Sequence, residues 1–308
     1  MIPAPFEYHA PKSLEEALRL MGQHGDEAKL LAGGHSLLPL MKLRLASPRY
    51  VIDLGRIRGM SYIHEDSGRI AIGAMTTHAE VAASGILREK CPLLAETAGE
   101  IGDMQVRNRG TMGGSLAHAD PAGDYPAAIL ALDAEMVATS SAGTRTIAAK
   151  DFFVDLLTTQ LRPGEILTEV RVQVQGAGTG SAYAKLHQPA SGFAIVGAAA
   201  VVSVDGSGKI KEATLGMTGV GAKAYRAGAV EKALRGKKAE AKVFADAARH
   251  AAQGVEVLSD IHASAAYRRE MAAVYARRAL ERAVARALGQ AAGRGAGHAG
   301  GRAEGKKA

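Results

Sequence analysis

Two glycine pairs, each followed closely by a hydroxyl side chain, are the residues of this sequence whose types and spacing best suit ligand binding. Gly33 and Gly34 lie in LLAGGHSLL, and Gly113 and Gly114 lie eighty residues later in TMGGSLAH. Glycine has no Cβ, so the backbone N–H groups of such a segment can approach an anion closely. Both segments are therefore candidate cradles for phosphate or pyrophosphate, and together they could hold two parts of one long ligand.

A glycine pair alone is weak evidence for a binding site. With 37 glycines in 308 residues, about four adjacent pairs are expected by chance, and short motifs carry a false-positive risk of this kind. Neither segment has the ending of a Walker site, which supplies a lysine and a magnesium-binding hydroxyl. On spacing alone, two tight turns without a ligand remain an equally good interpretation.

The sequence gives little indication of a disulfide, a metal site or a Rossmann-type dinucleotide site. The single cysteine, Cys91, can neither form an intramolecular disulfide nor hold an iron–sulfur cluster by itself, and the sequence has no CxxC or HExxH pattern for zinc. Residues 219–224, GVGAKA, fit a dinucleotide pattern but lack a suitably placed acidic residue, so we interpret them as a loop. We assign no catalytic residue and no metal ligand to the chain.

The charge of +7 does not indicate a nucleic-acid partner. Residues 289–308 carry +3 of it, the rest is scattered, tryptophan is absent and only 4% of the residues are aromatic. No apolar run reaches the length of ~18 residues that a membrane-spanning helix needs. The amino terminus lacks the basic start and apolar stretch of a secretory signal, and we expect a cytoplasmic protein.

The elements that would position the glycine segments alternate between helix and strand. Ser13 and Glu16 form a capping-box pattern that predicts an amphipathic helix ending at Gly25. Asp120 before Pro121 is a second predicted helix start. Apolar runs predict strands at 29–32, 50–54, from 69, 136–140, 145–153 and 166–174, and helices over 78–87, 91–102 and from 126.

A boundary is expected near the GAGTGS turn at 176–181, because small flexible residues dominate there. Beyond it, three runs predict an antiparallel sheet, and three helical stretches follow at 225–234, 239–253 and 263–288. The last 20 residues contain 13 Gly or Ala and no large aliphatic side chain. We therefore predict a disordered tail over 289–308.

The quoted segments give the chain a resemblance to a known family. AGGHSLLPLMKLRLA together with TMGGSLAHADPAGDYPAAILAL resembles the FAD-binding medium subunits of the molybdenum hydroxylases, the family of aerobic carbon monoxide dehydrogenase and xanthine dehydrogenase. The resemblance extends from FEYHAPKSLEEAL to about residue 288. It implies an α+β fold with an FAD domain of the vanillyl-alcohol-oxidase (PCMH) type. The implied divisions are subdomain 1 over 1–56, subdomain 2 over 57–176 and a carboxy-terminal α+β domain over 177–288.

The resemblance also implies which residues bind the cofactor. FAD is expected to lie extended between the two subdomains, with one cradle on its pyrophosphate side and a second opposite. Asp120 and Asp124 are implied acceptors for cofactor groups, with helix capping as an equally good alternative. Lys185 and Phe193 match positions near the flavin, and a solvated lysine and a core phenylalanine are at least equally good interpretations. The cradles comprise Ala32, Gly33, Gly34, His35 and Ser36, and Thr111, Met112, Gly113, Gly114 and Ser115.

Two positions depart from the family pattern. Relatives often have asparagine where Ser115 stands, and the position of Phe193 can be tyrosine. Serine still donates a hydrogen bond, so binding is expected to survive. The loss of a phenol near the ring leaves the route of flavin re-oxidation open.

By resemblance, the substrate is oxidised in a large molybdenum subunit, and a small subunit with two [2Fe-2S] clusters relays electrons to the FAD of this chain. The expected assembly is a dimer of heterotrimers. The chain would then pass electrons to an external acceptor, and neither that acceptor nor the substrate follows from the sequence. The alternatives are a self-sufficient FAD-dependent oxidase or reductase of the same fold and a non-catalytic nucleotide-binding module.

Overall fold

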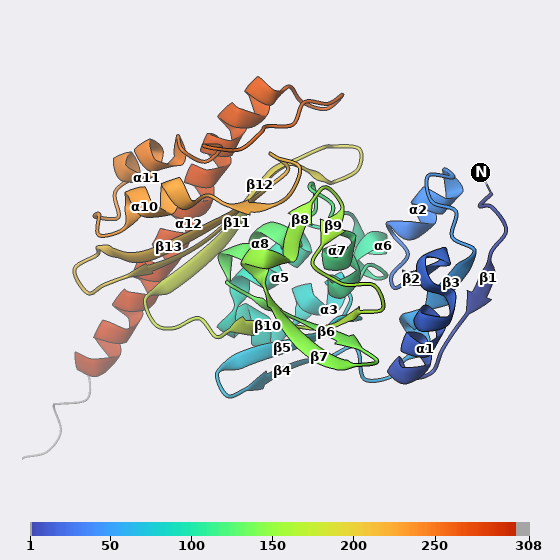
Figure 1. Cartoon of the computed structure of the whole chain (residues 1–308). Helices are drawn as coiled ribbons and strands as arrows, with labels where there is room; N and C mark the ends of the chain where they lie inside the picture. The colour runs from blue at the N-terminus through green and yellow to red at the C-terminus, as the bar shows by residue number, and fades with distance from the viewer. Residues whose placement is uncertain (1, 300–308) are drawn as a thin grey trace, which may run out of the picture.

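The computed structural model describes residues 2–299, with side chains described as far as residue 289. Three sheets of three to five strands follow one another along the chain, each accompanied by its own helices, and a two-stranded sheet accompanies the middle one (Figure 1). The colours of Figure 1 separate an amino-terminal unit in blue, a middle unit in cyan and green, and a carboxy-terminal unit in yellow to red. This is the α+β architecture that the resemblance implied.

The amino-terminal unit is a small parallel sheet with the strand order β1-β3-β2. Ser13 caps α1 by accepting a hydrogen bond from the Glu16 N–H, and Gly25 ends the helix with φ of 53°, as predicted. The Glu16 carboxylate accepts from the Lys12 N–H. The elements are β1 (Glu7–His9), α1 (Leu14–His24), β2 (Ala28–Leu31), α2 (Leu37–Lys42) and β3 (Tyr50–Asp53).

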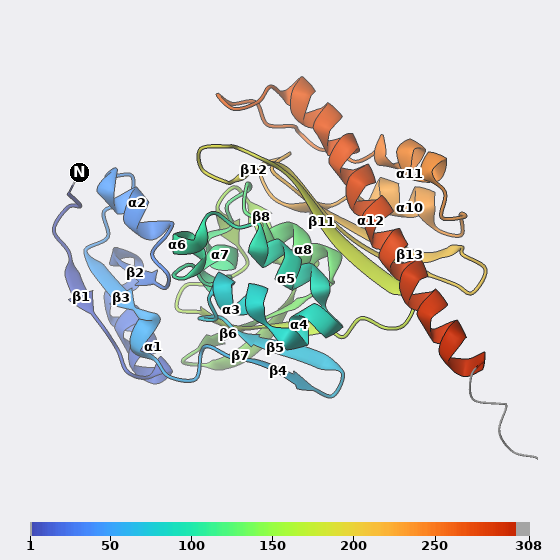
Figure 2. The same ribbon diagram turned by 180° about the vertical axis from the view of Figure 1, so that it is seen from behind.

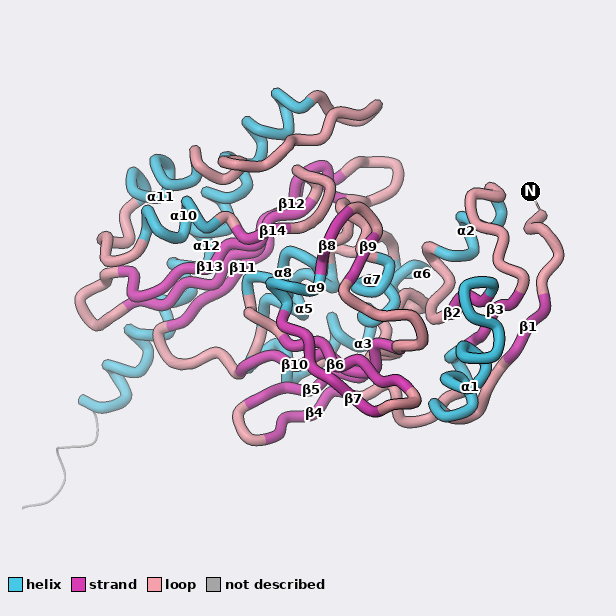
Figure 3. Tube along the Cα trace, viewed as in Figure 1, coloured by secondary structure: helices cyan, strands magenta, loops and turns pink. Residues whose placement is uncertain are grey.

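The middle unit is an antiparallel sheet with the order β4-β5-β10-β6-β7, and a group of short helices packs beside it (Figure 3). Its strands are β4 (Ile63–Asp66), β5 (Arg69–Gly73), β6 (Glu135–Ser140), β7 (Gly143–Ala148) and β10 (Ile166–Gln173), with the hairpin β8 (Phe153–Asp155) and β9 (Thr158–Thr159). Its helices are α3 (His78–Ala83), α4 (Gly85–Lys90), α5 (Pro92–Gly99), α6 (Met104–Arg107), α7 (Met112–His118), α8 (Tyr125–Ala131) and α9 (Ala149–Phe152).

The carboxy-terminal unit is a second antiparallel sheet, β11-β12-β13-β14, and the long helix α12 crosses it in front of β11 in Figure 2. On its other side β13 meets α8 so closely that a Cβ added to Gly216 would stand 2.0 Å from the Ala127 carbonyl oxygen. The elements are β11 (Thr179–His187), β12 (Ala194–Val204), β13 (Ile210–Thr218), β14 (Tyr225–Arg226), α10 (Gly228–Leu234), α11 (Ala241–Ala248) and α12 (Ala265–Ala299).

Several sequence expectations differ from the structure. Within the predicted strand at 145–153, residues Ala149–Phe152 form α9, and the predicted helix at 225–234 begins only at Gly228, after β14. No helix starts at Asp120, which instead accepts a hydrogen bond from the Ala122 N–H in a turn, and the helix begins at Tyr125. The second glycine pair lies in the first turn of α7 and not in a loop. Helix α12 continues to Ala299, beyond the predicted start of the tail, because alanine favours helix strongly. Residues 300–308 of the predicted tail lie outside the described residues.

Within residues 2–299, no helix has both the length and the apolar character needed to cross a bilayer.

Candidate functional site

The two glycine segments, eighty residues apart in sequence, meet on one cavity of about 490 Å³. A Cβ added to Gly33 would stand 2.2 Å from the Arg109 carbonyl oxygen and 2.7 Å from the Gly110 Cα. The first loop therefore touches the backbone that leads into α7, and only glycine permits this approach. Twelve of the fourteen predicted residues line the cavity: Ala32, Gly33, Gly34, His35, Ser36, Thr111, Gly113, Gly114, Ser115, Asp120, Asp124 and Phe193.

The first segment is the loop between β2 and α2, and its backbone is suited to hold an anion. Gly34 has φ of 81°, a conformation that glycine adopts without strain. The N–H groups of residues 33–36 donate no hydrogen bond to any residue that the structure describes, while the His35 ring lies 3.1 Å from the Gly33 carbonyl oxygen. Successive N–H groups of this kind are the usual donors to phosphate oxygens.

The second segment differs, because four of its five backbone donors, those of residues 112–115, are already used. Thr111 caps α7 through its side-chain oxygen. The N–H groups of the segment are paired as follows: Met112 with Thr76, Gly113 with Ala74, and Gly114 and Ser115 with Thr111. The groups that this segment can offer a ligand are therefore the Thr111 N–H, hydroxyls, foremost that of Ser115, and glycine surface without side chains.

Met112 and Gly113 of the second segment have packing roles. Met112 is fully buried in the core and does not line the cavity. A Cβ added to Gly113 would stand 2.5 Å from the Ala74 Cβ, so Gly113 lets α7 pack directly against the end of β5. This contact fixes the position of α7 at the wall of the cavity.

The two predicted carboxylates have different surroundings. Asp120 is partly exposed, and its Oδ2 lies 3.8 Å from the His118 ring. Asp124 is 5% exposed and accepts hydrogen bonds from Tyr183 and from Lys185. Burial raises the pKa of Asp124 to about 6, although Lys185 and Tyr183 oppose the rise. Asp124 stands at the N-cap position of α8, but its side chain accepts no hydrogen bond from a helix N–H.

Lys185 is not a solvated lysine, and Phe193 is not a core phenylalanine. The Lys185 side chain is buried and its Nζ donates to Asp124 and to the Glu100 carbonyl oxygen, so it stands behind Asp124 and does not line the cavity. Phe193 is 45% exposed and its ring lies at the cavity, where an aromatic face can pack on a planar ligand.

His78 is a cavity residue that sequence reasoning missed. It follows Thr77, which forms a complete capping box with Glu80 at the start of α3. The ring is 4% exposed, packs edge-on against Tyr125, and its buried Nδ1 has no partner among the described residues. Burial lowers the pKa of His78 to about 4. The capping pattern was visible in the sequence, but nothing there indicates that the imidazole faces a cavity.

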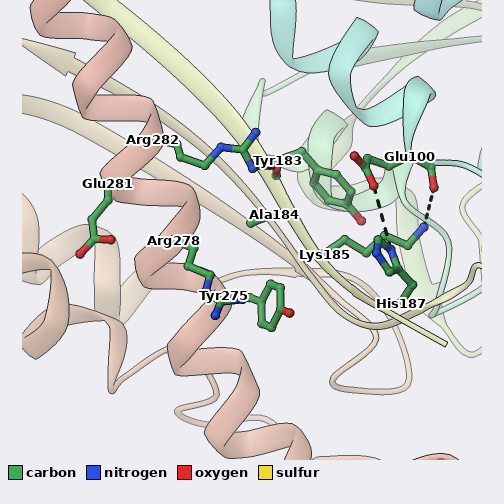
Figure 4. Close-up of a pocket in the computed structure, with 9 residues that line it drawn as sticks. All are labelled: Glu100, Tyr183, Ala184, Lys185, His187, Tyr275, Arg278, Glu281 and Arg282. Carbon is green, nitrogen blue, oxygen red and sulfur yellow. Dashed lines mark hydrogen bonds and ion pairs between the residues drawn. The ribbon is translucent and has the colours of Figure 1, made fainter. Parts of the chain in front are cut away.

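A second, smaller hollow of about 350 Å³, the outer pocket, opens between β11 and α12 (Figure 4). Lys185 and His187 point toward Glu100, while Glu281 points away from them. The His187 Nδ1 lies 4.0 Å from the Glu100 carboxylate. The remaining lining residues are Tyr183, Ala184, Tyr275, Arg278 and Arg282.

The comparisons with known proteins agree with this geometry. Residues 4–173 match the family described as the FAD binding domain in molybdopterin dehydrogenase, and residues 181–283 match the carbon monoxide dehydrogenase flavoprotein C-terminal domain. The medium chain of carbon monoxide dehydrogenase from Hydrogenophaga pseudoflava is 42% identical over 91% of this chain and 97% of that protein. Subunit alpha of the 6-hydroxypseudooxynicotine dehydrogenase complex from Paenarthrobacter nicotinovorans is 38% identical over 91% and 95%.

Solved structures give the same result. A chain of the Hydrogenophaga pseudoflava carbon monoxide dehydrogenase superimposes with a TM-score of 0.90 and 44% identity, over 93% of this chain and 99% of that chain. The two family matches, over residues 4–173 and 181–283, include both glycine segments and most of the sheet beyond them. The chain belongs to the family of FAD-binding medium subunits of the molybdenum hydroxylases, which are subunits of oxidoreductases.

Proposed function

We propose that this chain binds FAD in the cavity between its amino-terminal and middle units and serves as the electron-transferring subunit of a molybdenum hydroxylase complex. The observation that carries the proposal is the cavity itself, on which two glycine segments from separate units converge. In domain terms we propose FAD subdomain 1 over 1–56, FAD subdomain 2 over 57–176 and a carboxy-terminal domain over 177–288.

The residues at the cavity fit an extended dinucleotide. The N–H groups of residues 33–36 would hold the pyrophosphate, because phosphate oxygens supply the acceptors that these donors lack. The Ser115 hydroxyl would add a donor from α7. Phe193 would pack against the ring system, and Asp124 would accept from a polar group of the cofactor.

Lys185 acts at this site through Asp124. Its Nζ is held between the Asp124 carboxylate and the Glu100 carbonyl, so it fixes the carboxylate at the cavity wall instead of touching the cofactor. Apolar side chains such as Leu37, Ile101 and Leu167 line the cavity and would exclude water from the bound cofactor.

When bound, FAD supplies the ability to accept two electrons and release them singly or together, while the protein supplies position and electrostatics. The chain's own contribution is therefore to bind and orient. We propose a small iron–sulfur subunit as the electron source and a large molybdenum subunit as the site of substrate oxidation, in a cytoplasmic dimer of heterotrimers. The names of the relatives include carbon monoxide and 6-hydroxypseudooxynicotine dehydrogenases, which supports a substrate set by another subunit.

The proposal is tested by purifying the tagged chain from cells that express its genomic neighbours. We expect noncovalent FAD with its flavin absorbance, released on denaturation, and co-purification of two further chains that contain iron, sulfide and molybdenum. A folded, colourless chain that takes up no added FAD would contradict the binding site. A yellow chain that turns over a substrate without any partner would instead establish a self-sufficient enzyme.

A further inference from the structure

The buried pair of Asp124 and Lys185 lies between the FAD cavity and the outer pocket. The Asp124 side chain, 5% exposed, belongs to the wall of the FAD cavity, and Lys185 contributes to the wall of the outer pocket. The Lys185 Nζ lies 2.9 Å from the Asp124 Oδ2 and 2.8 Å from the Glu100 carbonyl oxygen. Figure 4 shows His187 beside Lys185 and Glu100. A continuous polar network therefore connects the two hollows.

The groups that face the Asp124 carboxylate come from three elements. Tyr183 and Lys185 of β11 donate hydrogen bonds to it, Glu100 next to α5 acts on it as a like charge, and Tyr125 follows it at the start of α8. Lys185 is the one cation among these groups, and burial already disfavours the charged form of the Asp124 carboxylate. Because the pKa of Asp124 is raised to about 6, a modest gain of negative charge nearby would protonate it at neutral pH.

We propose that Asp124 takes up a proton when the flavin bound in the cavity is reduced, so that the net charge of the cavity stays constant. This inference rests on the proposed function, in which the flavin ring packs against Phe193 in the cavity whose wall includes Asp124. Lys185 and Tyr183 are positioning residues, which hold the carboxylate and set the pH range in which it accepts the proton.

The step balances in protons and electrons. Two electrons from the iron–sulfur partner or a chemical reductant, with one proton, convert FAD to FADH⁻, which leaves one extra negative charge in the cavity. A second proton converts the Asp124 carboxylate to its carboxylic acid and cancels that charge. The protein thus takes up two protons for two electrons over the pH range in which Asp124 responds.

The test is a spectroelectrochemical titration of the FAD-loaded complex between pH 6 and pH 8. We expect the wild-type flavin potential to fall by about 30 mV more per pH unit than that of Asp124→Asn, because one proton per two electrons corresponds to that slope. Asparagine keeps the shape of the side chain and removes the titratable oxygen. Direct measurement of proton uptake with a pH indicator should give up to one proton fewer in the variant.

Glu169→Gln is the matched control. Glu169 is also a carboxylate held by a tyrosine and a cation, Tyr62 and Arg171, but it lies in β10 away from the cavity wall. We expect this variant to keep the wild-type slope. Lys185→Met should raise the pKa of Asp124, so that the carboxyl is already protonated before reduction and the extra proton is lost at pH 7, whereas Lys185→Arg should restore it.

Flavin content separates failure of this inference from failure of the proposed function. A complex without flavin contradicts the proposed function itself. An Asp124→Asn complex with full flavin and an unchanged slope would overturn the role of Asp124. Should that variant lose flavin, the infrared reduction difference spectrum of the wild type decides: a carboxylic acid C=O band that shifts with ¹³C-labelled aspartate supports the proposal, and its absence refutes it.

Discussion

Replacing Gly33 with alanine is expected to weaken FAD binding by about 100-fold or more, which corresponds to about 3 kcal/mol. The added Cβ would stand 2.2 Å from the Arg109 carbonyl oxygen and 2.7 Å from the Gly110 Cα. Both are backbone atoms, which cannot turn aside as a side chain can, so the 32–36 loop must move away from the segment that leads into α7. That movement separates the N–H groups of the loop from the Ser115 hydroxyl across the cavity.

Flavin content per chain and calorimetric titration of the apo chain with FAD measure this effect. The control is Gly22→Ala, because a Cβ at this position in α1 meets nothing within 4 Å. That variant should bind FAD normally and gain stability, since alanine favours helix over glycine by about 1 kcal/mol. If Gly33→Ala bound FAD as tightly as Gly22→Ala does, the close contact between the two segments would not matter for binding.

Much of the fold follows from local patterns in the sequence. The cap at Ser13, the end of α1 at Gly25 and the strand at residues 50–53 each depend on residues a few positions apart, and the structure has them where the patterns predict. The buried helix from Tyr125 also follows from a continuous apolar run. The meeting of the two glycine segments was predictable only from the resemblance, because spacing alone left two separate turns equally plausible.

The roles of individual site residues depended on contacts that no local pattern reveals. The partner of Lys185 is Asp124, 61 residues away, so a lysine that sequence alone would place in solvent is buried in an ion pair. The second glycine segment lies at the start of a helix whose donors are used by Ala74 and Thr76. Periodicity indicates which face of an element is buried, but it does not indicate which distant backbone meets that face.

The wild type is expected to lose stability through His78 as the pH falls from 6.5 to 4. The variant His78→Gln is expected not to show this loss. Burial lowers the pKa of His78 to about 4 in the folded chain, against about 6.5 in the unfolded chain. Between these values the unfolded state binds more protons, so the free energy of unfolding falls as the pH falls. The lowered pKa corresponds to about 3 kcal/mol at pH 4.

The titration of Asp124 changes the free energy of unfolding in the opposite direction over nearly the same pH range. Its pKa is about 6 in the folded chain, above the value of about 3.9 expected when it is unfolded. Between those values the folded state binds more protons, so this group makes the chain more stable as the pH falls. The two effects offset each other in the wild type, and removal of His78 should expose the contribution of Asp124.

The comparison between variant and wild type isolates the effect of His78, because every other group titrates in both proteins. Urea unfolding at pH 7 and pH 4 should show the variant gaining about 3 kcal/mol relative to the wild type. His250→Gln, which removes an exposed imidazole, should show no such gain. Equal responses of the two variants would mean that His78 is readily protonated in the folded chain above pH 4. Solvent or a hydrogen-bond partner would then reach its Nδ1, which is buried and has no partner among the residues that the structure describes.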